Sequence, residues 1–345
     1  MGDVRIALIR DWLASELGWK HDLRVEPASA DASFRRYFRV WRTSGSTAVV
    51  MDAPPDKESI APYLHIGSLL RSCGVHVPEV EAADAERGFL LLEDLGTTHM
   101  LARLGAGADP DQLYGEALAA LSLIQLHGEA ASRELAPYGA DVLEREMRLL
   151  PSWFCERHLG LRLDEEDSAL LTETFDFLTR EALAQPIVFV HRDYHSRNLM
   201  ITAERSPGVI DFQDALAGPI GYDLVSLLKD CYVSWPRARV AAWLNDHRAR
   251  LRAAGANVGV DDREFLRWFE LAGLQRHLKV LGIFCRLWYR DGKREYLADL
   301  PLTLDYVRGT AVRYTELRRF GAWVESTLVP GLQAANARAL SSVPA

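Results

Sequence analysis

The chain has 345 residues, of which 48% are hydrophobic and 26% charged, as expected of a globular protein with one large or two modest domains. Its net charge of −8 and the absence of a basic run argue against a nucleic-acid partner. No apolar stretch has the character of a signal peptide or a membrane span, so we expect a cytoplasmic protein without a membrane partner. The scattered cysteines argue against a zinc site or a disulfide framework.

The first part of the chain is predicted to form an antiparallel sheet with two helices. Apolar residues recur at helical spacing between Ile6 and Leu17, which predicts an N-terminal helix. A second helix is predicted over Glu58–Cys73, and Gly74 is expected to end it. Turn-rich segments separate five predicted strands, which cover Leu23–Pro27, Phe34–Trp41, Ala48–Ala53, Pro78–Ala82 and Gly88–Leu92.

From Asp109 onward helices dominate. Helical periodicity is clear over Gln112–Leu126 and Ala169–Ala184, and the chain after Tyr222 is again predicted to be helical. A short β-hairpin interrupts these helices. The sequence therefore predicts an α+β fold, with a small antiparallel sheet first and a mostly helical part after it.

The hairpin carries the most informative motif. The stretch VFVHRDYHSRNLMI, residues 188–201, contains His191, Asp193 and Asn198 in the pattern H-x-D-x4-N, and VIDFQDA follows with Asp211. Apolar runs anchor the loop on both sides, which disfavours the alternative that these polar residues merely decorate a surface loop. Two carboxylates and one amide presented together suit phosphoryl transfer from a nucleotide. We assign Asp193 as the catalytic base and Asn198 and Asp211 as ligands of Mg²⁺.

Four neighbouring residues complete the motif, and for two of them the sequence leaves alternatives open. His191 is expected to shape the loop through backbone bonds rather than to take part in the chemistry. His195 is either a donor to the transferred phosphate or the acceptor, or an exposed loop histidine. Asp214 either faces the substrate or takes part in a local turn. Asp223 is expected to brace the helix that follows it.

These motifs resemble the aminoglycoside phosphotransferase and choline kinase-like superfamily, whose members are relatives of protein kinases. LLLEDLG, residues 90–96, resembles the hinge between two lobes, and GPIGYDLVSLL, residues 218–228, resembles the segment after the metal-binding aspartate. The resemblance implies a two-lobed, kinase-like fold with the active site in the cleft between lobes. It implies an N-terminal nucleotide-binding lobe over 1–92, a hinge over 93–97 and a helical lobe with the catalytic loop and substrate site over 98–345.

The resemblance also implies a nucleotide site. Backbone groups of Glu93–Leu95 should pair with adenine, and we expect Glu93 and Leu95 to make the contacts. The loop ending at Ser33 should cover the phosphates. That loop has no glycine, and the chain has no P-loop or dinucleotide motif. The third strand, AVVMDAPP, also lacks the lysine that normally clamps the phosphates. A nearby cation is expected to replace it, with Arg36 assigned to the nucleotide site from a set comprising Arg35, Arg36, Arg39 and Lys57.

Three further segments resemble one branch of the superfamily: DASFRRYFRV, VVMDAPP and QRHLKVLGIF. That branch comprises bacterial kinases that phosphorylate N-acetylmuramate and N-acetylglucosamine at the anomeric hydroxyl during cell-wall recycling. The resemblance implies an Mg²⁺- and ATP-dependent kinase with an amino sugar as its partner. The alternatives are a kinase of the same fold for an aminoglycoside, choline or another alcohol, and a nucleotide-binding pseudokinase regulator suggested by the missing lysine. No feature of the sequence indicates an oligomeric state.

The segment around QRHLKVLGIF combines an apolar face with a basic edge. This edge is either a solvated helix face or one side of the cleft, where arginine would receive a substrate carboxylate. Its basic residues are Arg276, His277, Lys279, Arg286 and Arg290.

Overall fold

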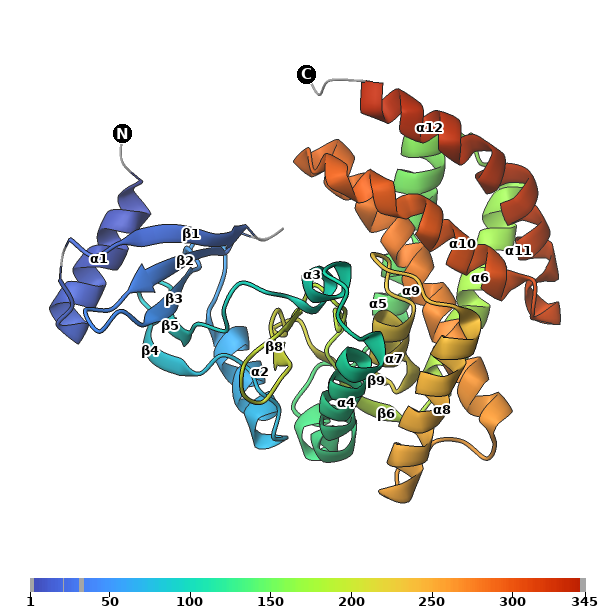
Figure 1. Cartoon of the computed structure of the whole chain (residues 1–345). Helices are drawn as coiled ribbons and strands as arrows, with labels where there is room; N and C mark the ends of the chain where they lie inside the picture. Colours follow the sequence, from blue (N-terminus) through green and yellow to red (C-terminus); the bar gives the residue numbers. More distant parts are fainter. Residues whose placement is uncertain (1–2, 21, 31–33, 342–345) are drawn as a thin grey trace. The chain divides into compact units, whose positions relative to one another are not determined.

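The computed structural model describes residues 3–20, 22–30 and 34–341 (Figure 1). Contacts between residues divide the chain into two compact units. Unit 1 comprises residues 1–108 and 197–214, and unit 2 comprises 109–196 and 215–345. Ser33, assigned above to the phosphate loop, lies outside the described residues.

Unit 1 is built on a five-stranded antiparallel sheet in the order β1-β2-β3-β5-β4. One face of the sheet packs against α1, Val4–Leu17, through a core that includes Trp12, Phe38, Val40 and Phe89 (Figure 1). Burial alternates along β2, since Phe38 and Val40 point into this core while their neighbours are partly exposed. The strands are Val25–Ala30, Arg36–Trp41, Thr47–Asp52, Val80–Asp84 and Phe89–Glu93, for β1 to β5.

The hairpin with the predicted metal ligands belongs to unit 1. Its strands are β7, Leu199–Met200, and β8, Gly208–Val209. Backbone bonds attach it to the rest of the unit, from the amide of Ile201 to the carbonyl of Thr98 and from the amide of Val209 to the carbonyl of His76. Two helices complete this unit in the described chain: α2 spans Ala61–Ser72, and α3 spans Met100–Gly105.

Unit 2 is organised around α9, Asp262–Asp291, a long helix that is buried on most sides (Figure 1). A short antiparallel ladder joins β6, Ile187–Val190, to β9, Leu216–Pro219. The other helices before α9 are α4 Pro110–Ser132, α5 Ala140–Met147, η1 Leu150–Leu159, α6 Glu165–Leu183, α7 Gly221–Leu228 and α8 Arg237–Ala253. Those after it are η2 Arg294–Asp299, α10 Leu300–Ala311, η3 Thr315–Leu317, α11 Arg318–Trp323, η4 Val324–Leu328 and α12 Val329–Ser341.

The predicted α+β fold, with a five-stranded antiparallel sheet followed by helices, is confirmed. The element bounds differ by a few residues, because strand ends depend on pairing; β1 runs on to Ala30 past an irregularity after Pro27. The predicted division at 92 and 97 stays a prediction, and unit 1 itself continues through α3 and takes in the hairpin. No helix of the described residues is long and apolar enough to cross a membrane.

Candidate active site

The catalytic loop, His191–Ser196, is held by two buried aspartates near the ends of α7. Asp223 accepts the backbone amides of His191 and Arg192, at 2.6 and 3.0 Å. Asp230 accepts the backbone amide of Ser196 at 3.0 Å. Arg192 takes a left-handed backbone conformation with φ 77°, which is uncommon outside glycine and here directly precedes Asp193. The loop conformation is therefore determined by carboxylates outside the motif.

Asp193 presents a partly exposed carboxylate, with 44% of its side chain accessible. Two effects of its surroundings on the pKa of Asp193 oppose each other. Desolvation by the protein raises the pKa of Asp193, whereas the positive charges of Lys279, His195 and Arg276 lower it, and the pKa lies well below its ordinary value. Asp193 is therefore ionised at neutral pH, as required of a group that accepts a hydrogen bond from a hydroxyl.

The cations behind Asp193 are themselves buried and paired. Arg276 is 4% exposed and Lys279 is 6% exposed. The Lys279 ammonium lies 3.0 Å from a carboxylate oxygen of Glu146 and 3.2 Å from the hydroxyl of Tyr222. Glu146 also pairs with Arg192. A buried charge needs such a partner, because desolvation would otherwise neutralise it.

The hypothesis of a solvated basic face on α9 is wrong for the middle of the helix. Arg276, His277 and Lys279 are all buried, because α9 is enclosed by other helices of unit 2. Arg286 is partly exposed, and Arg290, near the end of the helix, is exposed. The cleft-edge alternative for Arg276 stays open.

The two histidines of the loop are also buried. His191 is 1% exposed, and its Nδ1 lies 3.3 Å from the amide of Asp193, a geometry that supports a structural role. His195 is 9% exposed and meets the ring of Tyr232 edge-on, with centroids 5.3 Å apart. The alternative of an exposed loop histidine is therefore wrong for His195, and its contact with phosphate or acceptor stays a prediction.

In unit 1 the hairpin brings the two predicted metal ligands together. The amide of Ile210 donates to the carbonyl of Asn198, and the Asn198 side-chain amide lies 3.4 Å from Asp211 Oδ2. Gln213 Nε2 donates to Asp211 Oδ1 at 2.9 Å. Asp211 itself has φ 63°, a left-handed conformation that is uncommon outside glycine and that fixes the direction of its side chain.

This donor set fits Mg²⁺. One carboxylate and one amide oxygen are hard ligands, and Mg²⁺ usually takes only one or two protein ligands and completes its shell with water and phosphate oxygens. Among the described residues no group of three or more histidine, cysteine, aspartate or glutamate side chains is arranged to hold a metal. A dedicated all-protein cage is thus not found in that part of the chain, and a site shared with nucleotide phosphates suits Asn198 and Asp211.

The predicted adenine contacts lie at the end of β5. The amide of Glu93 donates to the carbonyl of Glu79 at 2.8 Å, and the Glu93 carboxylate accepts the Glu79 amide at 3.2 Å. Leu95 is 8% exposed and covers Gly208 of the hairpin, where an added Cβ would lie 2.6 Å from Leu95 Cδ1. A side chain at 208 would therefore displace the end of Leu95. The adenine contacts of Glu93 and Leu95 stay predictions.

The four candidate phosphate cations have different partners. Arg36 pairs with Asp3 and Asp52, and Arg39 binds Asp94 through two bonds of 2.6 and 2.9 Å. Lys57 is half-exposed, 3.4 Å from Asp56. Arg35 differs from these three, since its guanidinium lies 2.9 Å from Glu58 and 3.7 Å from Asp211. The assignment of Arg36 stays a prediction, but its charge already faces two carboxylates.

Asp214 is exposed and lies 3.3 Å from Gln213 Nε2, so its contact with substrate also stays a prediction. Sequence reasoning missed the loop-holding role of Asp230 and the partner role of Glu146. Asp230 follows the apolar run LVSLL, residues 224–228, which is a signal that it could be buried and paired, whereas Glu146 lies among other charged residues and gives no such signal.

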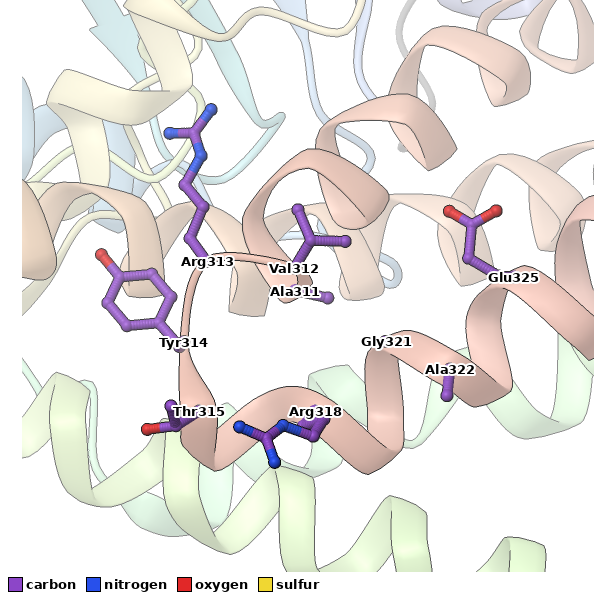
Figure 2. Close-up of a pocket in the computed structure, with 9 residues that line it drawn as sticks. All are labelled: Ala311, Val312, Arg313, Tyr314, Thr315, Arg318, Gly321, Ala322 and Glu325. Carbon is purple, nitrogen blue, oxygen red and sulfur yellow. The ribbon is translucent and has the colours of Figure 1, made fainter.

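A pocket of about 350 Å³ lies elsewhere in unit 2, where α10 ends and α11 begins (Figure 2). Tyr314 and Thr315 line it from the connecting segment, and Arg318 and Glu325 from the helical segment that follows. None of the predicted site residues lines this pocket. It is therefore distinct from the candidate active site.

Comparison with known proteins identifies the relatives of the chain. The sequence model described as "Phosphotransferase enzyme family" matches residues 24–269. The N-acetylmuramate/N-acetylglucosamine kinase of Pseudomonas aeruginosa is 45% identical, over 94% of this chain and 97% of that protein. The protein of the same name from Neisseria meningitidis is 45% identical, over 90% of this chain and 92% of that protein.

Solved structures share the fold. An AMP-bound spectinomycin phosphotransferase superposes with a TM-score of 0.62 at 13% identity, covering 89% of this chain and 98% of that one. The choline kinase of Streptococcus pneumoniae gives a TM-score of 0.59 at 13% identity, covering 89% of this chain and 100% of that one. The predicted kinase-like fold and superfamily are confirmed. From its sequence over most of its length and from its fold, the chain belongs to the phosphotransferase enzyme family.

Proposed function

We propose that the chain is an Mg²⁺- and ATP-dependent kinase that phosphorylates the anomeric hydroxyl of N-acetylmuramate and N-acetylglucosamine. The products would be sugar 1-phosphates, and the physiological setting the cytoplasmic recycling of peptidoglycan. The observation that carries the proposal is an ionised, firmly held Asp193 in a chain that is 45% identical to a curated kinase of that name over 94% of its length.

Asp193 performs the chemical role in this proposal. Its carboxylate accepts a hydrogen bond from the anomeric hydroxyl and directs that oxygen toward the phosphorus atom. The transition state of phosphoryl transfer is largely dissociative, so orientation contributes more than early proton removal. An anomeric hydroxyl is more acidic than an ordinary alcohol. Its proton passes to Asp193 as the new oxygen–phosphorus bond forms and the bond between that phosphorus and the bridging oxygen breaks, which releases ADP.

The remaining residues supply charge and position. Asn198 and Asp211 would hold Mg²⁺, and the bound ion would neutralise charge on the nucleotide phosphates. Asp223 and Asp230 keep the loop in place through its backbone amides. Burial raises the pKa of Asp223 to about 7, although two backbone amides oppose that shift.

The charges around Asp193 favour an anionic or neutral acceptor. Arg276 is buried within 3.8 Å of Asp193, and its Nε has no hydrogen-bond partner. The positive charge of Arg276 beside Asp193 attracts the lactyl carboxylate of muramate and repels a cationic acceptor. Choline and aminoglycosides are cations, and they require acidic or aromatic walls instead.

One screen separates the proposal from its rivals. ATP turnover is measured with N-acetylmuramate, N-acetylglucosamine, an aminoglycoside and choline, and the product is examined by phosphorus NMR. We expect both amino sugars to give a 1-phosphate. A 6-phosphate, or reaction only with the aminoglycoside or choline, contradicts the proposal. Nucleotide binding without turnover of any acceptor would favour a pseudokinase regulator, against which Asp193, Asn198 and Asp211 argue.

A further inference from the structure

The third strand of the sheet cannot supply a cation to the nucleotide. β3 ends at Asp52, a fully buried acidic residue that has no cation to offer. Two arginines neutralise it: Arg5 donates to Asp52 through Nε at 2.8 Å, and Arg36 through a terminal nitrogen at 2.6 Å. Arg36 is therefore already paired with two carboxylates, those of Asp52 and Asp3.

Arg35 lies on the other side of the strand. Successive side chains along an extended chain point to opposite faces, and Arg36 reaches Asp3, the first residue before α1. Arg35 points away from that helix and reaches Glu58, which lies shortly before α2, at 2.9 Å. The Arg35 side chain is 8% exposed, so its position is defined by packing as well as by charge.

The same guanidinium faces the predicted metal site. A terminal nitrogen of Arg35 lies 3.7 Å from Asp211 Oδ1, which is a charge contact rather than a hydrogen bond of ordinary length. Nucleotide phosphates held by a metal at Asp211 would therefore lie next to the guanidinium of Arg35. The second carboxylate oxygen of Glu58 is buried without a hydrogen-bond partner. Glu58 can therefore still accept a hydrogen bond from Arg35 when the guanidinium rotates to contact a phosphate.

From these contacts we propose that Arg35, positioned by Glu58, binds the phosphates of the nucleotide in place of the lysine that β3 lacks. The inference rests on the proposed function for the presence of ATP, and it assigns the phosphate contact to a residue outside β3. A guanidinium suits this role because it stays charged when buried and presents paired donors that match phosphate oxygens.

The test compares nucleotides by calorimetric titration without any sugar. ATP, ADP and adenosine are titrated into the full chain and into Arg35→Gln, Arg35→Lys, Glu58→Gln and the control Arg42→Gln. Arg42 pairs with Glu81 in the same unit and is partly exposed, 29%. Its replacement therefore removes an arginine–glutamate pair of similar kind, away from Asp211.

We expect Arg35→Gln to weaken the binding of ATP and ADP about ten- to a hundredfold, which is the usual contribution of a hydrogen bond to a charged group. The affinity for adenosine should be unchanged. Arg35→Lys should recover part of the loss. Glu58→Gln should lower ATP affinity less, because the arginine remains but is held less firmly. Arg42→Gln should bind all three as the unsubstituted chain does.

Unchanged preference for ATP over adenosine in both Arg35→Gln and Glu58→Gln would overturn the inference. Retained adenosine binding shows that each variant is folded. If Arg35→Gln does not fold, Glu58→Gln decides by the same comparison. Because no sugar is present, the titration does not depend on the identity of the acceptor. A failure of the proposed acceptor can therefore be distinguished from a failure of the proposed role of Arg35.

Discussion

The guanidinium of Arg276, in the middle of α9, lies 3.8 Å from the carboxylate of Asp193 in the catalytic loop. Arg276 is buried, whereas Asp193 is partly exposed, so the predicted base faces outward with a cation behind it. This arrangement keeps the carboxylate ionised and leaves its outer side accessible to an acceptor. It also links the helical core of unit 2 to the chemistry of the loop.

Removal of Arg276 should move the acid limb of the pH profile. The pKa of Asp193 is held well below the ordinary aspartate value of about 4, so Asp193 itself loses its charge only when the pH falls through that low value. Arg276→Gln removes one lowering charge, the pKa rises, and the limb of kcat/KM should appear at higher pH. Arg290→Gln, at the exposed end of the same helix, is the control. An unmoved limb in Arg276→Gln would exclude electrostatic support from Arg276.

Asp193→Asn should lower kcat by at least about a hundredfold, the usual order for a removed acid–base group, with ATP affinity largely kept. The amide preserves the shape of the side chain but cannot accept the proton. Turnover with N-acetylmuramate and calorimetric ATP binding are measured on the same preparation. The control is Asp176→Asn, an exposed carboxylate on α6. Activity within a few-fold of the unsubstituted chain would show that another group is the base.

Asp211→Asn should abolish the effect of Mg²⁺ on ATP binding, because it removes the charged member of the proposed ligand pair. ATP is titrated with Mg²⁺ and again with a chelator. We expect the unsubstituted chain to bind ATP more tightly with Mg²⁺ and the variant to show equal affinity in both solutions. An undiminished response to Mg²⁺ in the variant would place the ion elsewhere.

Gly282→Ala should destabilise unit 2. An added Cβ at this position in α9 would lie 2.5 Å from Leu149 Cβ and would also meet the Leu149 backbone. Overpacking of this kind costs about 1–3 kcal/mol, seen as a lower midpoint in chemical denaturation. Gly309→Ala in α10 is the matched control, since nothing lies within 4 Å of its added Cβ. It should be neutral or stabilising by up to about 1 kcal/mol through helix propensity. Equal midpoints for the two variants would contradict this prediction.

The loop and the sheet were predictable because their signals are local. Apolar alternation indicated the strands, and apolar runs on either side of H-x-D-x4-N indicated an anchored loop and a hairpin. The approach of Asn198 to Asp211 follows from the pairing of β7 with β8, which the hairpin pattern predicted. Sequence by itself therefore determined the fold class, and it supplied the hypothesis for the chemistry of the motif.

The partners of the charged residues depend on tertiary structure. Arg35 and Arg36 are adjacent and chemically identical, yet one faces Asp211 and the other Asp52, because strand geometry directs them to opposite sides. Arg276 could equally have been a solvated helix residue, and only the packing of helices around α9 buries it beside Asp193. Electrostatic roles arise from contacts between residues far apart in the chain, and no local pattern encodes those contacts.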